Sequence, residues 1–223
     1  MLELRNISIK YGERTILDIP HLQFVEGKRY GLIGQNGSGK TTLLRILAGT
    51  LKPTTGEISG IQADGMGYMP QAPYAFSFSV LRNVKMALER NPQRESLAIQ
   101  ALQNVGMGGM LTARGDKLSG GEAQRIACAR IIAKPRSLIL LDEPTSSTDI
   151  RGMDHIENIL LQYAQNTGCT MIFSTHSPAQ ALRLAEEVIF LDQGRIVEQG
   201  LAAQVLMDPQ SERAKLFLAH WRI

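Results

Sequence analysis

The chain has 223 residues, of which 43% are apolar and 20% are charged, and this composition predicts one globular domain with a sizeable core. The formal net charge is only +3, and 24 basic residues are interspersed among 21 acidic ones, so no polybasic block indicates a nucleic-acid partner. No run approaches the roughly 18 consecutive apolar residues that a membrane span requires. Residues 1–11 lack the apolar core of a secretory signal, so we expect a cytoplasmic chain that does not cross a bilayer alone.

Apolar periodicity predicts an α/β chain that begins with strands and continues with alternating helices and strands. Residues 2–8 and 15–25 alternate as half-buried strands do, the second as one or two strands, which favours an N-terminal antiparallel sheet. Further strands are predicted at 29–33, 57–59, 66–69, 138–141, 169–174, 188–191 and 195–199, and helices at 41–48, 80–88, 97–105, 121–133, 153–163 and 178–185, with terminal helical segments after them. Such alternation implies a mostly parallel sheet covered on both faces.

The character of the sequence changes between residues 72 and 118. Two helical patterns there are followed by a glycine-rich stretch at 106–109. We interpret 72–118 as an α-helical subdomain inserted into a core made of residues 1–71 and 119–223. The core and the insertion together form a single domain.

A glycine-rich loop follows the strand at 29–33 and opens the next helix. Its residues match the pattern G-x-x-x-x-G-K-[ST] and are Gly34, Gln35, Asn36, Gly37, Ser38, Gly39, Lys40 and Thr41, followed by Thr42. Glycines let successive amides converge on phosphate oxygens, and the helix N-terminus adds partial positive charge. Lys40 can reach the β and γ phosphates of ATP, and the Thr41 hydroxyl can ligate Mg²⁺. Chance alone would give this pattern in on the order of one chain in a hundred, so a mere glycine turn is disfavoured.

Two acidic residues follow the buried strand at 138–141. Open α/β sheets bind ligands at the carboxyl ends of their strands. Asp142 is therefore expected to hold Mg²⁺, directly or through water, and Glu143 to polarise a water against the γ phosphate. Alone, the pair could equally cap a helix before Pro144, but beside the phosphate loop we favour the catalytic interpretation.

The most specific string of the sequence is Leu118, Ser119, Gly120, Gly121 and Glu122, which resembles the LSGGE-type signature of ABC (ATP-binding cassette) ATPases. It would arise by chance in on the order of one chain in two thousand. Two glycines at a helix start leave amides open to an anion, and Ser119 adds a hydroxyl donor. The resemblance covers nearly the whole chain. It implies a P-loop NTPase core whose two copies pack head to tail, each signature closing over the other copy's ATP.

The same resemblance implies roles for three further residues. Tyr11 resembles the aromatic residue that stacks on adenine, although a Tyr at a strand end usually only packs. Gln71 resembles the glutamine that touches Mg²⁺ or water and senses the membrane partner. His176 resembles the switch histidine that contacts the γ phosphate and positions water. Thr148 departs from the Leu that is more frequent in the loop that reaches across the dimer.

These motifs define the expected site. The expected ATP contacts are Tyr11, Gly34, Asn36, Gly37, Ser38, Gly39, Lys40, Thr41, Thr42, Ser119, Gly120, Gly121 and Glu122; the expected Mg²⁺ ligands are Thr41, Gln71 and Asp142; and the expected catalytic residues are Lys40, Gln71, Glu143 and His176.

The resemblance also implies partners. They are a second ABC ATPase subunit, integral membrane permease subunits and a solute-binding protein, with the chain on the inner face of the cell membrane. Three aromatic residues at 74–78 would suit docking of a membrane subunit, or they could be buried core. We expect import of a small solute; export, a cell-envelope complex, or a soluble ABC ATPase acting on nucleic acid or ribosomes are the alternatives. The soluble class is disfavoured because the chain has no coiled-coil insertion, second cassette or basic stripe.

Overall fold

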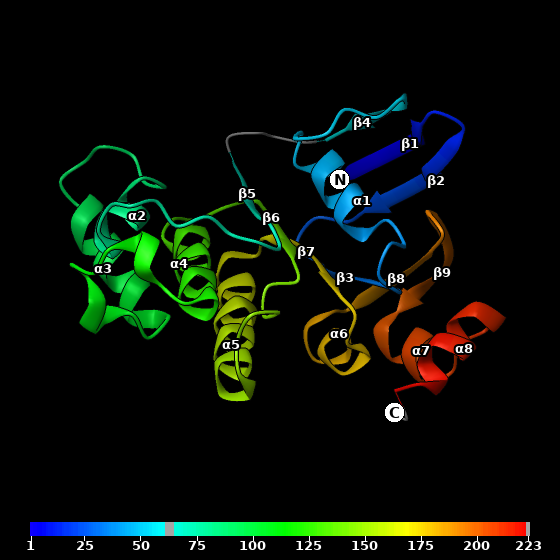
Figure 1. Cartoon of the computed structure of the whole chain (residues 1–223). Coiled ribbons are helices and arrows are strands. Elements are labelled where there is room, and N and C mark those ends of the chain that lie inside the picture. Colours follow the sequence, from blue (N-terminus) through cyan, green and yellow to red (C-terminus); the bar gives the residue numbers. More distant parts are fainter. Residues whose placement is uncertain (61–64, 222–223) are drawn as a thin grey trace.

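The computed structural model describes residues 1–60 and 65–221, which form two β-sheets flanked by helices (Figure 1). The smaller sheet contains β1 (Leu2–Tyr11), β2 (Arg14–Phe24) and β4 (Thr55–Ser59) in the order β2-β1-β4, and both strand pairs are antiparallel. The segment predicted as one or two strands at 15–25 is a single strand, because β1 pairs with β2 along nearly its whole length. The predicted N-terminal antiparallel sheet is confirmed.

The larger sheet has the strand order β5-β6-β7-β3-β8-β9. Its strands are β3 (Arg29–Ile33), β5 (Met66–Met69), β6 (Leu138–Asp142), β7 (Thr170–Thr175), β8 (Glu187–Asp192) and β9 (Arg195–Leu201). Every adjacent pair is parallel except β8 with β9, so the predicted mostly parallel sheet is confirmed. The carboxyl ends of β3, β5, β6 and β7 consequently lie at one edge of the sheet, where their loops can meet.

Helices cover both faces of the larger sheet (Figure 1). The α-helices of the described residues are α1 (Lys40–Leu47), α2 (Val80–Lys85), α3 (Arg94–Asn104), α4 (Gly120–Ile132), α5 (Ile150–Thr167), α6 (Pro178–Leu184), α7 (Ala202–Met207) and α8 (Glu212–Ala219), of which α2 and α3 lie apart from the sheet. Five of them begin at a Ser or Asp whose side chain accepts a hydrogen bond from the amide three residues later: Ser79, Ser119, Asp149, Ser177 and Ser211. Because Asp149 and Gly168 cap α5, this helix extends beyond the predicted 153–163 at both ends.

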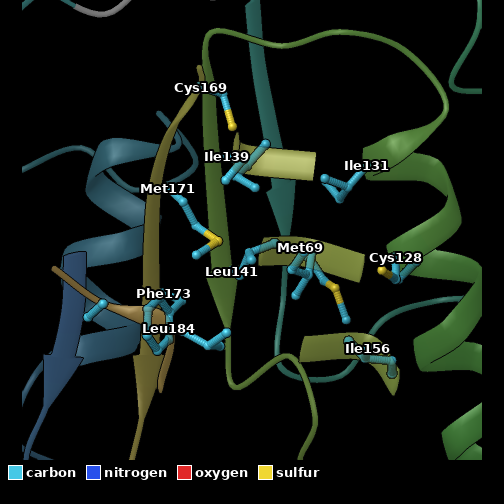
Figure 2. Packing of buried hydrophobic residues seen from close by; sticks show 14 of the residues in the cluster. Met69, Cys128, Ile131, Ile139, Leu141, Ile156, Cys169, Met171, Phe173 and Leu184 are labelled. Atoms are coloured by element: carbon cyan, nitrogen blue, oxygen red, sulfur yellow. The ribbon is translucent and has the colours of Figure 1, made fainter. Parts of the chain in front are cut away.

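The strands of the larger sheet alternate their side chains between two apolar layers. In β6, Leu138 and Leu140 pack with α1 and the smaller sheet, whereas Ile139 and Leu141 pack on the opposite side. Figure 2 shows this second layer, in which Ile139, Leu141 and Met171 of β6 and β7 lie on the side of Cys128, Ile131 and Ile156 from α4 and α5, and Phe173 lies beside Leu184 of α6. Burial on both faces explains why these strands are continuous apolar runs.

Helices α2 and α3 pack against each other and against α4, at the end of the molecule opposite β1 and β2 (Figure 1). The buried side chains of α2 and α3 belong to one apolar cluster with those that β6 and β7 direct toward α4. Within the described ranges, no helix is both long and apolar enough to cross a membrane.

Candidate functional site

The loop between β3 and α1 encloses the side chain of Lys40. The Nζ atom of Lys40 donates hydrogen bonds to the carbonyl oxygens of Gly34 at 2.8 Å and Gln35 at 2.9 Å, and the residue is buried. Gly34 has a φ of 149°, and a Cβ atom there would lie 2.1 Å from the carbonyl oxygen of Leu191. Only glycine fits, because both the backbone conformation and β8 exclude a side chain. Two of the three ammonium donors are used within the loop, which leaves one for a phosphate oxygen.

The electrostatics of this loop favour an anionic ligand. Burial lowers the pKa of the Lys40 ammonium, and the nearby carboxylates of Glu143 and Asp142 oppose that shift. The negative charge of a bound polyphosphate would favour the charged ammonium, as the two carboxylates do. The Lys40 ammonium is thus buried, and its charge is only partly balanced by the two carboxylates, so a phosphate group would stabilise it further.

Asp142 connects three elements at the carboxyl edge of the sheet. It lies opposite Ser174 in the parallel register of β6 and β7, and the Ser174 hydroxyl donates to its Oδ1 at 2.6 Å. The hydroxyl of Thr41, in the first turn of α1, donates to the same oxygen at 3.1 Å. One carboxylate oxygen therefore ties the phosphate loop to the sheet.

Two buried oxygen atoms beside the loop have no hydrogen-bond partner among the described residues. They are Oδ2 of Asp142 and Oγ of Ser38. Unsatisfied buried polar atoms are rare and indicate a missing ligand. A free carboxylate oxygen next to the Thr41 hydroxyl suits a hard cation such as Mg²⁺, and a serine hydroxyl within a glycine-rich loop suits a phosphate oxygen. The residues present therefore fit both expected groups.

Glu143, Gln71 and His176 converge from the loops after β6, β5 and β7. The Nε2 atom of Gln71 donates to Oε2 of Glu143 at 3.2 Å, and Nδ1 of His176 lies 3.7 Å from the same oxygen. The Glu143 side chain is 13% exposed, whereas that of His176 is 53% exposed. Three residues that are far apart in the sequence are thus brought together as expected.

The backbone of Glu143 is held in an unusual conformation by two residues that the sequence analysis did not identify. Its φ is 46°, which is uncommon for a residue with a side chain. The Glu143 amide donates to the Ser174 hydroxyl at 2.9 Å, and its carbonyl accepts from Nε2 of the fully buried Gln124 at 2.9 Å. Gln124 also accepts from the Ser147 amide at 3.0 Å. These bonds fix the turn that presents Glu143. The only signal in the sequence was a glutamine within an apolar helix.

A cavity of about 840 Å³ lies over the phosphate loop, a size suited to a nucleotide. It is lined by Arg14, Ile16, Gln35, Asn36, Gly37, Gly39, Lys40, Thr41, Thr42, Gln71, Glu143 and His176. Tyr11 is 64% exposed and is not among the described residues that line this cavity. Arg14 and Ile16 of β2 line it instead, and adenine stacking by Tyr11 stays a prediction.

The signature residues Ser119 to Glu122 are not among the lining residues either. The Oε2 atom of Glu122 accepts hydrogen bonds from the amide and the hydroxyl of Ser119, both at 2.8 Å, and the Ser119 hydroxyl accepts from the Glu122 amide at 3.3 Å. The bonds from Ser119 lower the pKa of Glu122. The Ser119 hydroxyl, expected to donate to an anion, is thus engaged by Glu122 within the single chain. The amides of Gly120 and Gly121 lie in the first turn, where a helix provides no acceptor.

Comparison with known proteins identifies the family. The family model described as ABC transporter matches residues 17–146. The chain is 35% identical to the tungstate uptake system ATP-binding protein TupC of Peptoclostridium acidaminophilum, and the match covers 88% of this chain and 97% of that protein. This chain belongs to the ABC transporter ATPase family. The ABC ATPase is also 34% identical to the L-cystine transport system ATP-binding protein TcyN of Escherichia coli (strain K12), covering 97% and 96% of the two chains.

Solved structures agree with this family. The ABC ATPase resembles the dimeric, post-hydrolysis state of the ATP-binding cassette MJ0796 bound to ADP and Pi, with a TM-score of 0.82 and 26% identity over 91% of this chain and 99% of that chain. It resembles the dimeric structure of the same bacterial cassette with a TM-score of 0.83. The fold class and the ATPase activity predicted from the motifs are therefore confirmed.

A Gln124→Met variant of the ABC ATPase tests how Glu143 is held. Methionine keeps most of the volume but loses the bonds to the Glu143 carbonyl and the Ser147 amide. We expect the turnover number for ATP to fall by about tenfold while KM changes little. Losing the hydrogen bonds of Gln124 would let the turn shift and misplace the Glu143 carboxylate, and a barrier raised by about 1.4 kcal/mol corresponds to this tenfold fall. Steady-state kinetics measure this effect.

Gln180→Met is the matched control. Gln180 is also buried and donates to Thr145 and Glu157, so this variant should lose a similar amount of stability, about 1–3 kcal/mol, by denaturant unfolding. It has no bond to Glu143 and should retain turnover. If both variants lost turnover equally, general loosening of the core would explain the result and the positioning role of Gln124 would be wrong.

Proposed function

We propose that this ABC ATPase binds ATP between two copies of itself and uses hydrolysis to drive a membrane transporter that imports a small solute. The observation that carries the proposal is the separation of the two phosphate-binding parts. The cavity over Lys40 is lined by the phosphate loop, Gln71, Glu143 and His176 but not by Ser119. One copy therefore offers an incomplete enclosure, and a second copy facing it would supply the signature helix.

The residues of one copy divide the work on the triphosphate. Lys40 and the amides of the phosphate loop bind and orient the β and γ phosphates. Mg²⁺, when held by Thr41 and Asp142, would neutralise charge on the phosphate oxygens. Glu143 is placed to orient a water and accept its proton, while Gln71 and His176 flank its carboxylate within 3.2 and 3.7 Å.

The signature helix of the second copy must change its local bonds to take part. The Glu122 carboxylate occupies the Ser119 amide and hydroxyl, and like charge would repel an approaching phosphate. Closing the pair would require the Ser119 hydroxyl to turn from Glu122 to the γ phosphate. The amides of Gly120 and Gly121 and the helix dipole would then contribute without rearrangement.

A Glu143→Gln variant tests the proposed dimer. The amide preserves the shape of the side chain but cannot accept a proton, so closed pairs should accumulate with Mg²⁺ and ATP. We expect a dimer by size exclusion with light scattering, carrying one ATP per subunit. Without ATP, the variant should be monomeric.

A Glu89→Gln variant serves as the control, because Glu89 is 85% exposed and lies outside the cavity lining. It should behave as the wild type in both measurements. If the Glu143→Gln variant remained monomeric with saturating Mg²⁺ and ATP and released its nucleotide freely, ATP-driven pairing would have no support.

A separate surface supports a membrane partner. Tyr74 is 68% exposed and Phe76 is 39% exposed, which makes the buried-core interpretation of this segment wrong for Tyr74. The rings of Tyr74 and Phe76 contact each other edge to face, with their centroids 5.0 Å apart, and Phe76 stacks on Phe78 with a centroid distance of 6.2 Å. Beside them lies a cavity of about 380 Å³ that is lined by Pro73, by Ala127 and other residues of α4, and by β5. Exposed aromatics beside a hollow are typical of protein interfaces.

The backbone of the segment at 74–78 is fixed by hydrogen bonds from two side chains, those of Asn83 and Arg130. The side chain of the fully buried Asn83 accepts from the Phe76 amide at 2.8 Å and donates to the Phe76 carbonyl at 3.0 Å. Arg130 of α4 donates to the Tyr74 carbonyl at 2.6 Å and to the Asn83 carbonyl at 3.0 Å. The aromatic rings are therefore presented by a fixed loop that begins just after Gln71, so a partner bound here could influence the catalytic site.

Several further parts of the proposal depend on relatives or on packing. The relatives from Peptoclostridium acidaminophilum and Escherichia coli are named for uptake and transport systems, which supports import. We place the chain in the cytoplasm, on the inner face of the cell membrane, with permease subunits and a solute-binding protein as partners. The packing of α2 and α3 on α4 supports treating residues 72–118 as a helical subdomain.

Affinity purification from detergent-solubilised membranes tests the membrane partner. The wild type should recover an integral membrane protein, and a Tyr74→Ser/Phe76→Ser double variant should recover at least about tenfold less, because the anchors of such interfaces dominate their affinity. Leu216→Ser, on the exposed face of α8, should recover the wild-type amount. Recovery of nucleic acid alone would favour the soluble class of ABC ATPase.

A further inference from the structure

His176 has few contacts that could fix the orientation of its ring. Its side chain is 53% exposed, and Nδ1 lies 3.7 Å from the Glu143 carboxylate, beyond hydrogen-bond distance. Within residues 1–60 and 65–221, no hydrogen bond to the imidazole is formed. An exposed imidazole without a hydrogen bond can rotate among several orientations.

The indole of Trp221 supplies a second contact. Its ring centroid lies 6.0 Å from that of His176, with the two planes inclined at 42°. Trp221 follows the end of α8, and its amide donates to the Leu218 carbonyl at 2.9 Å. The imidazole therefore has two neighbours, the Glu143 carboxylate and an indole from a distant part of the chain.

Helix α8 holds the indole against the core. The ring centroid of Phe217 lies 6.4 Å from that of Trp221. The Phe217 ring also packs edge to face on Phe190 of β8, with a centroid distance of 5.2 Å. The first turn of α8 is fixed by Ser211, whose side chain accepts from the Ala214 amide, and by Glu198, which accepts from the Ser211 amide at 2.9 Å. A row of aromatic rings thus leads from the larger sheet to His176.

We propose that Trp221 is a positioning residue for His176, holding the imidazole toward Glu143 and the cavity. The inference rests on the catalytic role of His176 in the proposed function, and it adds a residue that no motif assigns. Aromatic rings at this separation gain a modest interaction energy beyond the area that they bury. Of the two aromatic rings that contact Trp221 among residues 1–60 and 65–221, His176 lines the cavity and Phe217 does not, so we expect its effect to be transmitted through His176.

Steady-state kinetics of the full chain test the effect on turnover. We expect Trp221→Ala to lower kcat about three- to tenfold and to leave KM for ATP within about twofold. Trp221→Phe should restore most of the lost activity, because a phenyl ring can pack against the imidazole. Leu216→Ala, a change on the exposed face of the same helix, should have no effect.

A double-mutant cycle separates positioning from a general structural role. In a His176→Ala background, Trp221→Ala should lower kcat no further, because the residue it positions is gone. An equal further loss in that background would overturn the inference while leaving the proposed function intact. Wild-type turnover in the His176→Ala variant alone would instead contradict the proposed role of His176, and the inference would fall with it.

Fluorescence gives a readout that does not depend on turnover. Trp221 is the chain's single tryptophan, so its emission reports on one environment. Without nucleotide, His176→Ala should change the intensity or the wavelength of this emission, whereas Glu89→Gln should not. Identical emission from the wild type and His176→Ala would show that the two rings do not pack together and would overturn the inference.

Discussion

The parallel register of β6 and β7 places the reactive groups of this ATPase together. Asp142 and Ser174 face each other at the ends of these strands, and the same Ser174 hydroxyl contacts Asp142 and the amide of Glu143. A slip of one residue would move Asp142 to the other face of the sheet and separate it from Thr41. The positions of Asp142 and Glu143 relative to the phosphate loop thus depend on the pairing of two fully buried strands.

The same corner of the sheet is linked mechanically to the signature helix. Gln124 lies on the second turn of α4 and bonds to both the Glu143 carbonyl and the Ser147 amide, while Ser119 begins that helix. If α4 moved when two copies meet, the hydrogen bond from the buried Gln124 would transmit that movement to the Glu143 backbone. Arg130, farther along α4, bonds to the Tyr74 carbonyl of the exposed aromatic segment. Helix α4 therefore bonds to the catalytic turn and to the exposed aromatic segment, and it begins at the signature residues.

Sequence alone predicted the parts of the site that depend on local patterns. The phosphate loop, the acidic pair after β6 and the succession of helices and strands along the chain follow from short motifs and apolar periodicity, which need no tertiary information. Gln124 and Ser174 escaped, because their bonds to Glu143 span 19 and 31 residues and depend on how α4 and β7 pack beside β6. Trp221 escaped for the same reason. The capping box at Ser119 depends on Glu122 three residues later and engages the hydroxyl within one copy, so the contact of Ser119 with the other copy's ATP stays a prediction.

Complementation between two defective variants tests the shared site most directly. Both variants carry Glu143→Gln; one adds Lys40→Ala, and the other adds Gly120→Asp, where a Cβ is tolerated at 3.5 Å from Ser147 but a carboxylate would repel phosphate. Each alone should retain no ATP. Mixed, they should retain one ATP per pair, because one of the two sites then combines an intact phosphate loop with an intact signature from the other chain. Absence of retained ATP in the mixture, or full retention by the Gly120→Asp variant alone, would contradict a site divided between two copies.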